Sequence, residues 1–436
     1  MAANGKGNGN GSFNFLIILL ITILIIPMLN KAPIVVCIAS NQGDENSAAV
    51  SLEVVHRLRL TDNRGLGQLA GLQSTRRSQP KYYSANLPVT HKSRNVLGSH
   101  SVQVWLGSTH TPLTLVLDTG SDVTWTQCQP CDRHRHRCYN QAGPIFDPKK
   151  STTYSAVTDK ARCGPGPCEY GVEYTDDSFS FGTVSTDNLT LSRGVVVSKF
   201  LFGCGRNNTL GGHDDAGLMG LGNTELSFVS QTSQRFRRKF SYCLNTEQGG
   251  GTGHLTFGGG ARGGSIKYTE LLHDYSGSGF YLVDMVGINL NGVQLPISSA
   301  VFGNGTFVDS GRSVSVLPLE AYRVLNDSFA KTMGRKYRRA EGDGVLESCY
   351  DLSVAAAADI PKVSFRFGGG VVVDLNPASV VVDVTGDPRR SRACLAFVPD
   401  YSPDQMGVFG NYQQQTLEMV YDVAGGKLGF GQNGCT

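Results

Sequence analysis

Short apolar runs, rich in β-branched and aromatic residues, recur from about residue 86 to the C-terminus, with Gly, Asn and Asp between them. They include SVQVWLG, LTLVLDTG, KFLFGCG, GHLTFGG, YLVDMVGINLNG, KVSFRFGGG and LEMVYDVAGGKLGFG. Runs of this length bounded by turn residues are typical of β-strands. The pattern therefore predicts an all-β fold, mainly strands with few short helices.

Two segments show helical spacing instead. In residues 318–333, Pro318 suits a first helical turn. Four apolar residues of this segment share one face: Tyr322, Leu325, Phe329 and Met333. A second, shorter helix is predicted near residues 226–236. Helix is thus expected to be the minor component.

The N-terminal region has the pattern of a targeting segment. Residues 13–29 are apolar and free of charge, Lys6 precedes them, and Cys37 and Ala39 offer small residues for cleavage. We therefore predict a signal peptide over residues 1–39. An uncleaved signal anchor is the alternative, since a 17-residue run is near the lower limit for crossing a bilayer. Residues 40–85 are polar and basic, and we expect a prosegment there.

One short motif occurs twice in the strand-rich region. An apolar run followed by Asp, a hydroxyl residue and Gly is found at Asp118 and again at Asp309, 191 residues later. Each copy is followed by two apolar residues and a Gly, at 218–220 and at 408–410. One repeat per half is the simplest explanation.

A glycine-dense segment at 247–265 could join the two halves. We therefore predict an N-terminal lobe over 86–265 and a C-terminal lobe over 266–436, with a cleft between them. The N-terminal lobe would carry the first Asp, and the C-terminal lobe the second.

Composition narrows the class of protein. The chain of 436 residues is 40% hydrophobic and 17% charged, so it can bury a large core. Its net charge of +3 gives no field that suggests a polyanion as the main partner. Of eleven cysteines, ten remain when Cys37 is set aside, an even number that suits an oxidising compartment. Four sequons are glycosylation candidates: Asn188, Asn207, Asn304 and Asn326.

The paired aspartate turns suggest a specific chemistry. A carboxylate on a glycine turn after an apolar strand can be held rigidly at the floor of a cleft. Two carboxyls a few ångströms apart share one proton, which makes one a base and the other an acid. Such a pair can activate water and polarise a peptide carbonyl without a covalent intermediate, metal or cofactor. Asp118 and Asp309 are therefore candidates for acid-favoured peptide hydrolysis.

Residues 95–436 resemble a pepsin-like aspartic protease of the plant nepenthesin type, close to the subgroup that contains the chloroplast nucleoid DNA-binding protease. The resemblance rests on LDTGSDVTWTQCQPC, FDPKKSTTY, YTDDSFSFGTVSTDNLTL, FGCG, AGLMGLG, FSYCL, VDSGRSVSVLP, CYDLS, CLAFVP and FGNYQQQTLEMVYDVAGGKLGF. It implies a bilobal pepsin-like fold and an aspartic endopeptidase made as a zymogen.

The resemblance also implies roles for individual residues. Asp118 and Asp309 would be the catalytic pair, and Thr119 and Ser310 would grip each other beneath it. Ser121 would hydrogen-bond the outer oxygen of Asp118, and the turn glycines Gly120 and Gly311 complete the motif. Tyr174 matches the tyrosine of a mobile flap and Trp125 the indole that hydrogen-bonds it, although Trp125 judged by itself would be a packing residue. Cys349 with Cys394 is the implied disulfide, and Cys243 with Cys435 is a plausible second one.

Two positions depart from the pattern of that family. Arg312 stands where Thr or Ser is expected. If its guanidinium pointed at Asp309, it would lower the pKa of that carboxyl by about 1–3 units. If it pointed to solvent, Asp309 would lose one hydrogen bond. The second departure is Thr175, which replaces a Gly after the flap tyrosine and disfavours positive φ. Both changes predict weakened activity.

Three alternatives stay open at this stage. The segment CQPCDRHRHRC could form a zinc site from Cys128, Cys131, Cys138, His134 and His136, although disulfides are favoured and no metal is expected. The basic stretches RHRHR and RFRRK could contact DNA, but short charge runs are usually solvated surface, so DNA is not expected as a partner. The chain could also be a catalytically impaired binding protein, similar to the plant xylanase inhibitors.

The implied partners are protein or peptide substrates and pepstatin-type inhibitors. We expect a monomer with no stable membrane partner unless the signal stays uncleaved. The expected location is the secretory pathway, leading to the apoplast or the vacuole, with the chloroplast as the alternative. Disulfide pairing in the first lobe is left open by the sequence.

Overall fold

The computed structural model describes residues 84–92, 98–131, 138–246, 253–259, 265–273, 277–352, 360–385 and 392–435. The predicted signal peptide and nearly all of the predicted prosegment lie outside these ranges. Strands dominate the described part, with a few short helices, so the all-β prediction is confirmed. Throughout these ranges we find no helix that is both long and apolar enough to cross a membrane.

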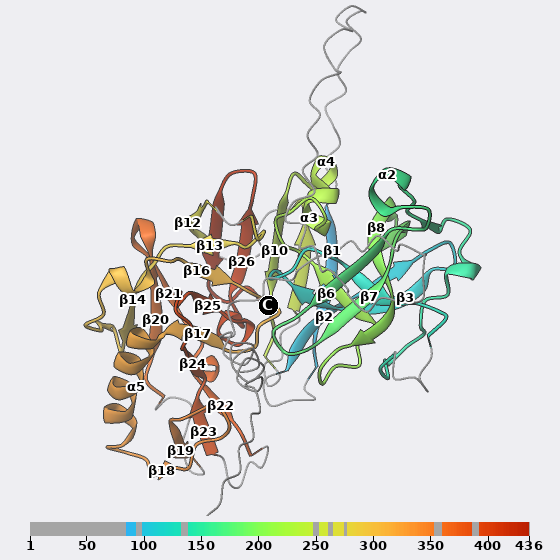
Figure 1. The fold of residues 1–436 in the computed structure, drawn as a ribbon. Coiled ribbons are helices and arrows are strands. Elements are labelled where there is room, and N and C mark those ends of the chain that lie inside the picture. Colours follow the sequence, from blue (N-terminus) through green and yellow to red (C-terminus); the bar gives the residue numbers. More distant parts are fainter. Residues whose placement is uncertain are drawn as a thin grey trace, which may run out of the picture.

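The first half contains eleven strands and three α-helices in its described residues. They are β1 (Ala85–Lys92), β2 (Ser99–Leu106), β3 (Thr111–Asp118), β4 (Trp125–Gln127), β5 (Ser155–Ala156), α2 (Lys160–Cys163), β6 (Glu169–Glu173), β7 (Phe179–Ser192), β8 (Val195–Thr209), β9 (Gly217–Gly220), α3 (Phe228–Gln231), α4 (Ser233–Phe236), β10 (Lys239–Cys243) and β11 (Gly253–Phe257). This half forms the blue-to-green lobe in Figure 1.

The described residues of the second half form the yellow-to-red lobe on the opposite side (Figure 1). Its elements are β12 (Lys267–Leu272), β13 (Leu282–Val283), β14 (Met285–Leu290), β15 (Val293–Gln294), β16 (Thr306–Val308), β17 (Ser315–Pro318), α5 (Leu319–Met333), β18 (Arg339–Ala340), β19 (Cys349–Asp351), β20 (Val363–Phe367), β21 (Val371–Asp374), β22 (Val381–Asp383), β23 (Arg392–Leu395), β24 (Phe397–Asp400), β25 (Gly407–Phe409), α6 (Asn411–Gln414), β26 (Glu418–Asp422) and β27 (Lys427–Gly431).

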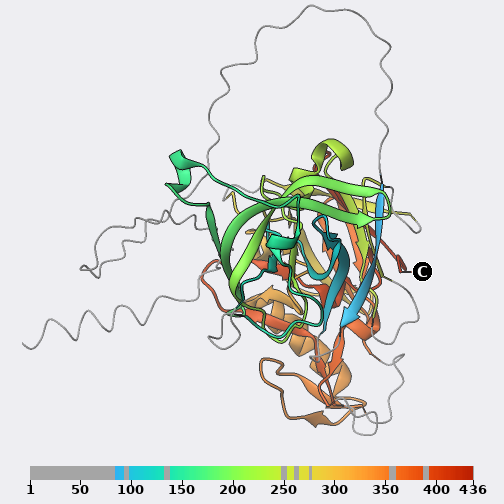
Figure 2. The same cartoon turned by 90° about the vertical axis from the view of Figure 1, so that its right-hand side faces the viewer.

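A sheet that runs through both lobes joins them. Strand β10 of the first half pairs antiparallel with β26 of the second, from Lys239 opposite Asp422 to Cys243 opposite Glu418. The aromatic side chains of this junction pack tightly, with the rings of Phe240 and Tyr421 stacked at a centroid distance of 4.3 Å. Figure 2 shows the molecule turned by 90°, with the blue-to-green lobe nearest the viewer. Burial of large rings on both strands fixes the lobes to each other.

The same strand arrangement occurs once in each lobe. In the first, β3 lies parallel to β9, and β4 lies antiparallel to β9. In the second, β16 lies parallel to β25, and β17 pairs antiparallel with β25 at Val316 and Val408. The Gly-terminated runs at 218–220 and 408–410, noted in the sequence, supply β9 and β25. The internal repeat is therefore a repeated structural unit, and in each copy the aspartate turn follows the first strand.

The long helix lies where the spacing predicts it. Helix α5 begins at Leu319, immediately after Pro318, and buries the predicted apolar face. The segment 226–236 differs, because it forms two short helices and not one. Thr232 separates them with φ −104° and ψ 12°, and its hydroxyl donates to the Phe228 carbonyl. The Thr232 hydroxyl competes with backbone N–H groups for the Phe228 carbonyl, which favours a break between the two helices at Thr232.

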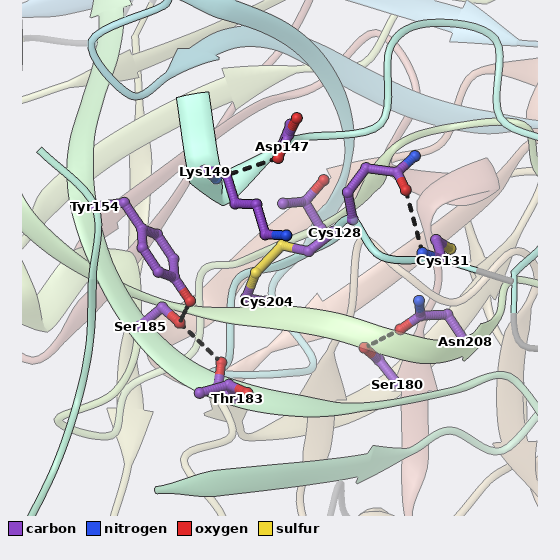
Figure 3. The surroundings of a disulfide bond; sticks show 12 residues. Cys128, Cys131, Asp147, Lys149, Tyr154, Ser180, Thr183, Ser185, Cys204 and Asn208 are labelled. Atoms are coloured by element: carbon purple, nitrogen blue, oxygen red, sulfur yellow. Dashed lines mark hydrogen bonds between the residues drawn. A yellow bond between two sulfur atoms is a disulfide. The ribbon is translucent and has the colours of Figure 1, made fainter. Parts of the chain in front are cut away.

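Five disulfides connect the described cysteines. They are Cys128–Cys204, Cys131–Cys138, Cys163–Cys168, Cys243–Cys435 and Cys349–Cys394. The first joins the end of β4 to β8, beside the hydrogen-bonded pair Tyr154 and Ser185 (Figure 3). All three cysteines of the alternative zinc site are consumed in disulfides, so that alternative is wrong. Its two histidines lie outside the described residues.

Candidate active site

The two aspartate turns come from equivalent places in the two lobes. Asp118 is the last residue of β3, and Asp309 directly follows β16. In each turn the glycine two residues after the aspartate donates its backbone N–H to the carboxylate Oδ1, at 2.8 Å in both cases. These local bonds fix each carboxyl relative to its own strand.

Beneath the carboxyls, the turns are bonded to each other. The Thr119 backbone N–H donates to the Ser310 hydroxyl at 3.0 Å, and the Ser310 N–H donates to the Thr119 hydroxyl at 2.9 Å. Each hydroxyl also donates onward to a strand carbonyl of the opposite lobe, Thr119 to Val308 and Ser310 to Leu117. Both side chains are buried, with exposed fractions of 0% and 1%. This reciprocal network brings together the residues that the sequence placed 191 positions apart.

The two carboxyls lie close together, as the glycines between them show. A Cβ on Gly120 would lie 2.7 Å from the Asp309 Cγ, and a Cβ on Gly311 would overlap the Asp118 carboxylate. Only glycine leaves room for each carboxyl against the turn of the opposite lobe. The predicted need for glycine is therefore steric at both turns.

Burial and proximity raise the pKa of both carboxyls. The pKa of Asp309 is raised to about 8, first because burial disfavours the charged form and then because Asp118 carries like charge. Burial also raises the pKa of Asp118, while hydrogen bonds from Ser121, from Gly120 and with Asp309 act in the opposite direction. Ser121 donates to Oδ2 of Asp118, as the sequence suggested. The pair can hold one proton at a pH where isolated carboxyls are ionised.

A hairpin of β6 and β7 carries Tyr174 toward this pair. The Tyr174 hydroxyl accepts a hydrogen bond from the Trp125 indole N–H at 2.8 Å. Trp125 itself is fully buried in a cluster that includes Val116 and Leu218. Trp125 is therefore both a packing residue and the hydrogen-bond partner of Tyr174. Burial raises the pKa of Tyr174, and the nearby negative charge of Asp118 raises it further.

The turn at the tip of this hairpin has its left-handed residue at a different position from the one expected. The left-handed residue is Asp177, with φ of 64°, and Thr175 is not among the positive-φ residues of the described chain. Asp176 binds the turn through its carboxylate, which accepts from the backbone N–H and the hydroxyl of Ser178. Thr175 therefore does not occupy the left-handed position of this hairpin, which lies two residues later at Asp177.

Arg312 adopts neither of the two predicted orientations. Its backbone N–H donates to Oδ1 of Asp309 at 3.2 Å, while its guanidinium reaches the flap, where Nη1 lies 3.4 Å from the Thr175 hydroxyl. Burial and the like charge of Asp118 keep the pKa of Asp309 raised, and the positive charge of Arg312 acts to lower it. The direction of its effect is therefore as expected, but burial and the like charge of Asp118 outweigh the guanidinium.

Residues of α6 support the second turn and were not singled out individually from the sequence. The Asn411 amide donates to the Ser310 carbonyl at 3.1 Å, and the Gln414 amide donates to the carbonyls of Asp309 and Phe409. The signal was present in the stretch FGNYQQQ, where three consecutive glutamines follow an apolar run. Side-chain amides suit this role because each one can satisfy buried carbonyls of an irregular turn.

The remaining predicted positions lie away from the carboxyl pair. Cys349 and Cys394 pair on β19 and β23. Among the sequons, Asn207 and Asn304 are exposed, and Asn188 and Asn326 are half-buried. The Asn326 Oδ1 accepts a hydrogen bond from the Ser348 hydroxyl. Within the ranges that the structure describes, no group of acidic, histidine and cysteine side chains could hold a metal ion.

Comparison with known proteins finds matches over most of the chain. The family descriptions "Xylanase inhibitor N-terminal" and "Xylanase inhibitor C-terminal" match residues 100–259 and 280–432. An aspartyl protease family protein of Arabidopsis thaliana is 41% identical over 368 residues, covering 81% of this chain and 76% of the relative. The aspartic proteinase nepenthesin-2 of Nepenthes gracilis is 30% identical and covers 75% of each chain.

Solved structures agree on the fold. The crystal structure of basic 7S globulin from soybean matches with a TM-score of 0.64 at 18% identity, covering 81% of this chain and 97% of that one. Conglutin gamma, a basic 7S globulin from lupine seeds, matches with a TM-score of 0.61, also at 18% identity, covering 81% of this chain and 96% of that one. At this level of identity the likeness concerns the fold alone.

Proposed function

This chain belongs to the plant aspartyl proteases and is an aspartic-type endopeptidase, and we propose that Asp118 and Asp309 are its catalytic pair. The observation that carries this proposal is the packing of each carboxyl against the turn glycine of the opposite lobe. Such proximity makes simultaneous ionisation costly, so that one proton is shared. Its substrates are peptide bonds of proteins or peptides.

In the proposed reaction the two carboxyls have different tasks. Asp118, whose ionised form accepts hydrogen bonds from Ser121 and Gly120, takes a proton from a water molecule. The water oxygen then bonds to the peptide carbonyl carbon, and the proton of Asp309 moves to the carbonyl oxygen. When the tetrahedral intermediate breaks its C–N bond, Asp118 gives its proton to the leaving nitrogen. Asp309 regains a proton from the intermediate's hydroxyl.

The surrounding residues position these carboxyls. The exchange of hydrogen bonds between Thr119 and Ser310 keeps the two turns at a fixed separation. We assign Tyr174 to the closure of the flap over the substrate, with Trp125 holding its hydroxyl. Closure would exclude water and orient the scissile bond.

The proposal extends to location and partners. Five disulfides among the described residues support folding in an oxidising compartment. We propose passage through the secretory pathway to the apoplast or vacuole, with residues 40–85 released from a zymogen. We further propose that the enzyme acts as a monomer, binds pepstatin-type inhibitors and does not depend on DNA. The alternative of a non-catalytic inhibitor-like protein has less support, since the two relatives of 30% identity or more named above are called an aspartyl protease family protein and an aspartic proteinase.

The deciding experiment uses the purified mature protein with casein and a quenched peptide at about pH 3–7. We expect cleavage that pepstatin inhibits and that Asp118→Asn and Asp309→Asn each abolish. Glu320→Gln, an exposed acidic residue in the first turn of α5, is the matched control and should keep full activity. Pepstatin binding without cleavage by the unmutated protein would instead support the binding-protein alternative.

A further inference from the structure

We propose that Arg312 is a specificity-determining residue that favours substrates with an acidic side chain close to the scissile bond. This inference rests on the proposed proteolytic function of the same cleft. It follows from a contact between two positions that both depart from the family pattern: the Arg312 guanidinium meets Thr175 on the flap, 137 residues away in the chain.

The guanidinium of Arg312 lies between the second aspartate turn and the flap. Arg312 is tied by its backbone N–H to the carboxylate of Asp309, while its side chain extends to the residue directly after Tyr174. A peptide must pass between the flap and the carboxyl pair to be cleaved. Arg312 therefore bounds the space through which the substrate runs, and it is half-buried there.

Arg312 has hydrogen-bonding capacity that the contact with Thr175 does not use. A guanidinium has five N–H donors, and the contact with the neutral Thr175 hydroxyl uses one of them at a long distance. Within the described residues, no carboxylate forms an ion pair with Arg312. A planar donor fork of this kind is suited to a carboxylate, which it can bind through two parallel hydrogen bonds.

Three acidic residues lie near the positive charge of Arg312 and determine its effect on a substrate. Asp118 and Asp309 together carry about one negative charge while they share a proton, and they would repel an acidic substrate. On the flap, the Asp176 carboxylate is turned to Ser178 of its own hairpin. Arg312 is thus the positive group that can offset this repulsion and hold a substrate carboxylate beside the scissile bond.

The preference should depend on pH in a defined direction. A glutamate side chain in a flexible peptide has a pKa of about 4.3, and pairing with Arg312 favours its ionised form. The advantage is therefore present above this pKa and is lost as the pH falls and the substrate carboxyl is protonated. Arg312 stays charged throughout this range.

The test uses pairs of quenched peptides that differ only by Glu or Gln at one position. One such pair is made for each of the three positions on either side of the scissile bond. At about pH 5.5 we expect kcat/KM for the best-placed Glu peptide to exceed that of its Gln partner about fivefold, the effect of a partly exposed charge pair of about 1 kcal/mol. At about pH 3 the ratio should approach one. Arg312→Gln should bring the ratio at about pH 5.5 close to one as well, and Arg312→Lys should keep part of the preference at that pH.

Arg323→Gln, an exposed arginine of α5 outside the cleft, is the charge-matched control and should leave the ratio unchanged. A ratio near one at every position in an active enzyme would overturn the inference but not the proteolytic function. Equal changes for Glu and Gln peptides in Arg312→Gln would also overturn it, since they would mean that Arg312 acts on the flap alone. Should cleavage be absent altogether, calorimetry with uncleavable Glu and Gln peptides still decides, because the inference requires tighter binding of the Glu form.

Discussion

Thr119 and Ser310 each donate a backbone N–H to the hydroxyl of the other, so that two residues from different lobes are joined twice. The Thr119 hydroxyl makes a further bond to the Val308 carbonyl. A change at this position therefore affects stability and the spacing of the carboxyl pair together.

The first prediction concerns Thr119→Val, which keeps the shape of the side chain and removes its hydroxyl. It leaves the Ser310 N–H and the Val308 carbonyl unpaired, so the free energy of unfolding should fall by about 2–3 kcal/mol. Because the turns lose their fixed separation, kcat should fall about 10- to 100-fold. Urea unfolding and peptide cleavage measure the two effects.

Thr232→Val is the control, because Thr232 is equally buried and its hydroxyl donates to Phe228 within the α3–α4 segment. It should cost about 1 kcal/mol of stability and leave kcat unchanged. An equal loss of kcat in both variants would contradict a special role for the bonds between the turns.

The second prediction concerns Gly311→Ala. The added methyl group would overlap the Asp118 carboxylate, so the pair must separate, and we expect kcat to fall at least about 100-fold. Gly143→Ala is the matched control, since nothing lies within 4 Å of a Cβ at that position. Full activity of Gly311→Ala would mean that the carboxyls do not need their close approach.

The third prediction concerns the bond between Trp125 and Tyr174. Tyr174→Phe and Trp125→Phe should each lower kcat/KM, because each variant removes one of the two groups that form this hydrogen bond and so loosens the flap. The double variant should be less impaired than the sum of the single effects, with a coupling of about 1 kcal/mol. Strictly additive effects on the activation free energy would show that the bond has no part in flap function.

The fourth prediction concerns pH. Both carboxyls have folded-state pKa values above the unfolded value, so the stability linked to them is fully present below about pH 3.9 and is lost as pH rises through the raised values. Asp309→Asn removes one of the like charges, so its free energy of unfolding should fall less between about pH 4 and 8. Chemical unfolding across this range measures the difference. Glu320→Gln should follow the unmutated protein, and a parallel fall in Asp309→Asn would refute the linkage.

The sequence was sufficient for the elements that depend on local patterns. The two Asp–hydroxyl–Gly turns and the Gly-terminated runs at 218–220 and 408–410 revealed a repeated unit, because its strands follow one another in the same order in each half. The helix after Pro318 was predictable for the same reason, since its buried face repeats with helical spacing.

Features set by distant contacts were not predictable. Arg312 and Thr175 were each recognised as departures, but their contact depends on how the flap of one lobe lies over the turn of the other. The disulfide partner of Cys128 was also not predictable from the sequence, because Cys204 lies 76 residues away on a parallel neighbouring strand. The raised pKa of Asp309 reflects burial, which residue type alone does not report.

The bond between Cys243 and Cys435 closes 192 positions of the polypeptide into a covalent ring that contains all of the second lobe from β12 onward. A single cut anywhere inside this ring would leave one molecule of unchanged mass apart from the added water. Such nicked enzyme would run as a single species on a gel without reductant and separate into fragments only after reduction. A processing event in this lobe would therefore escape a gel that is run without a thiol.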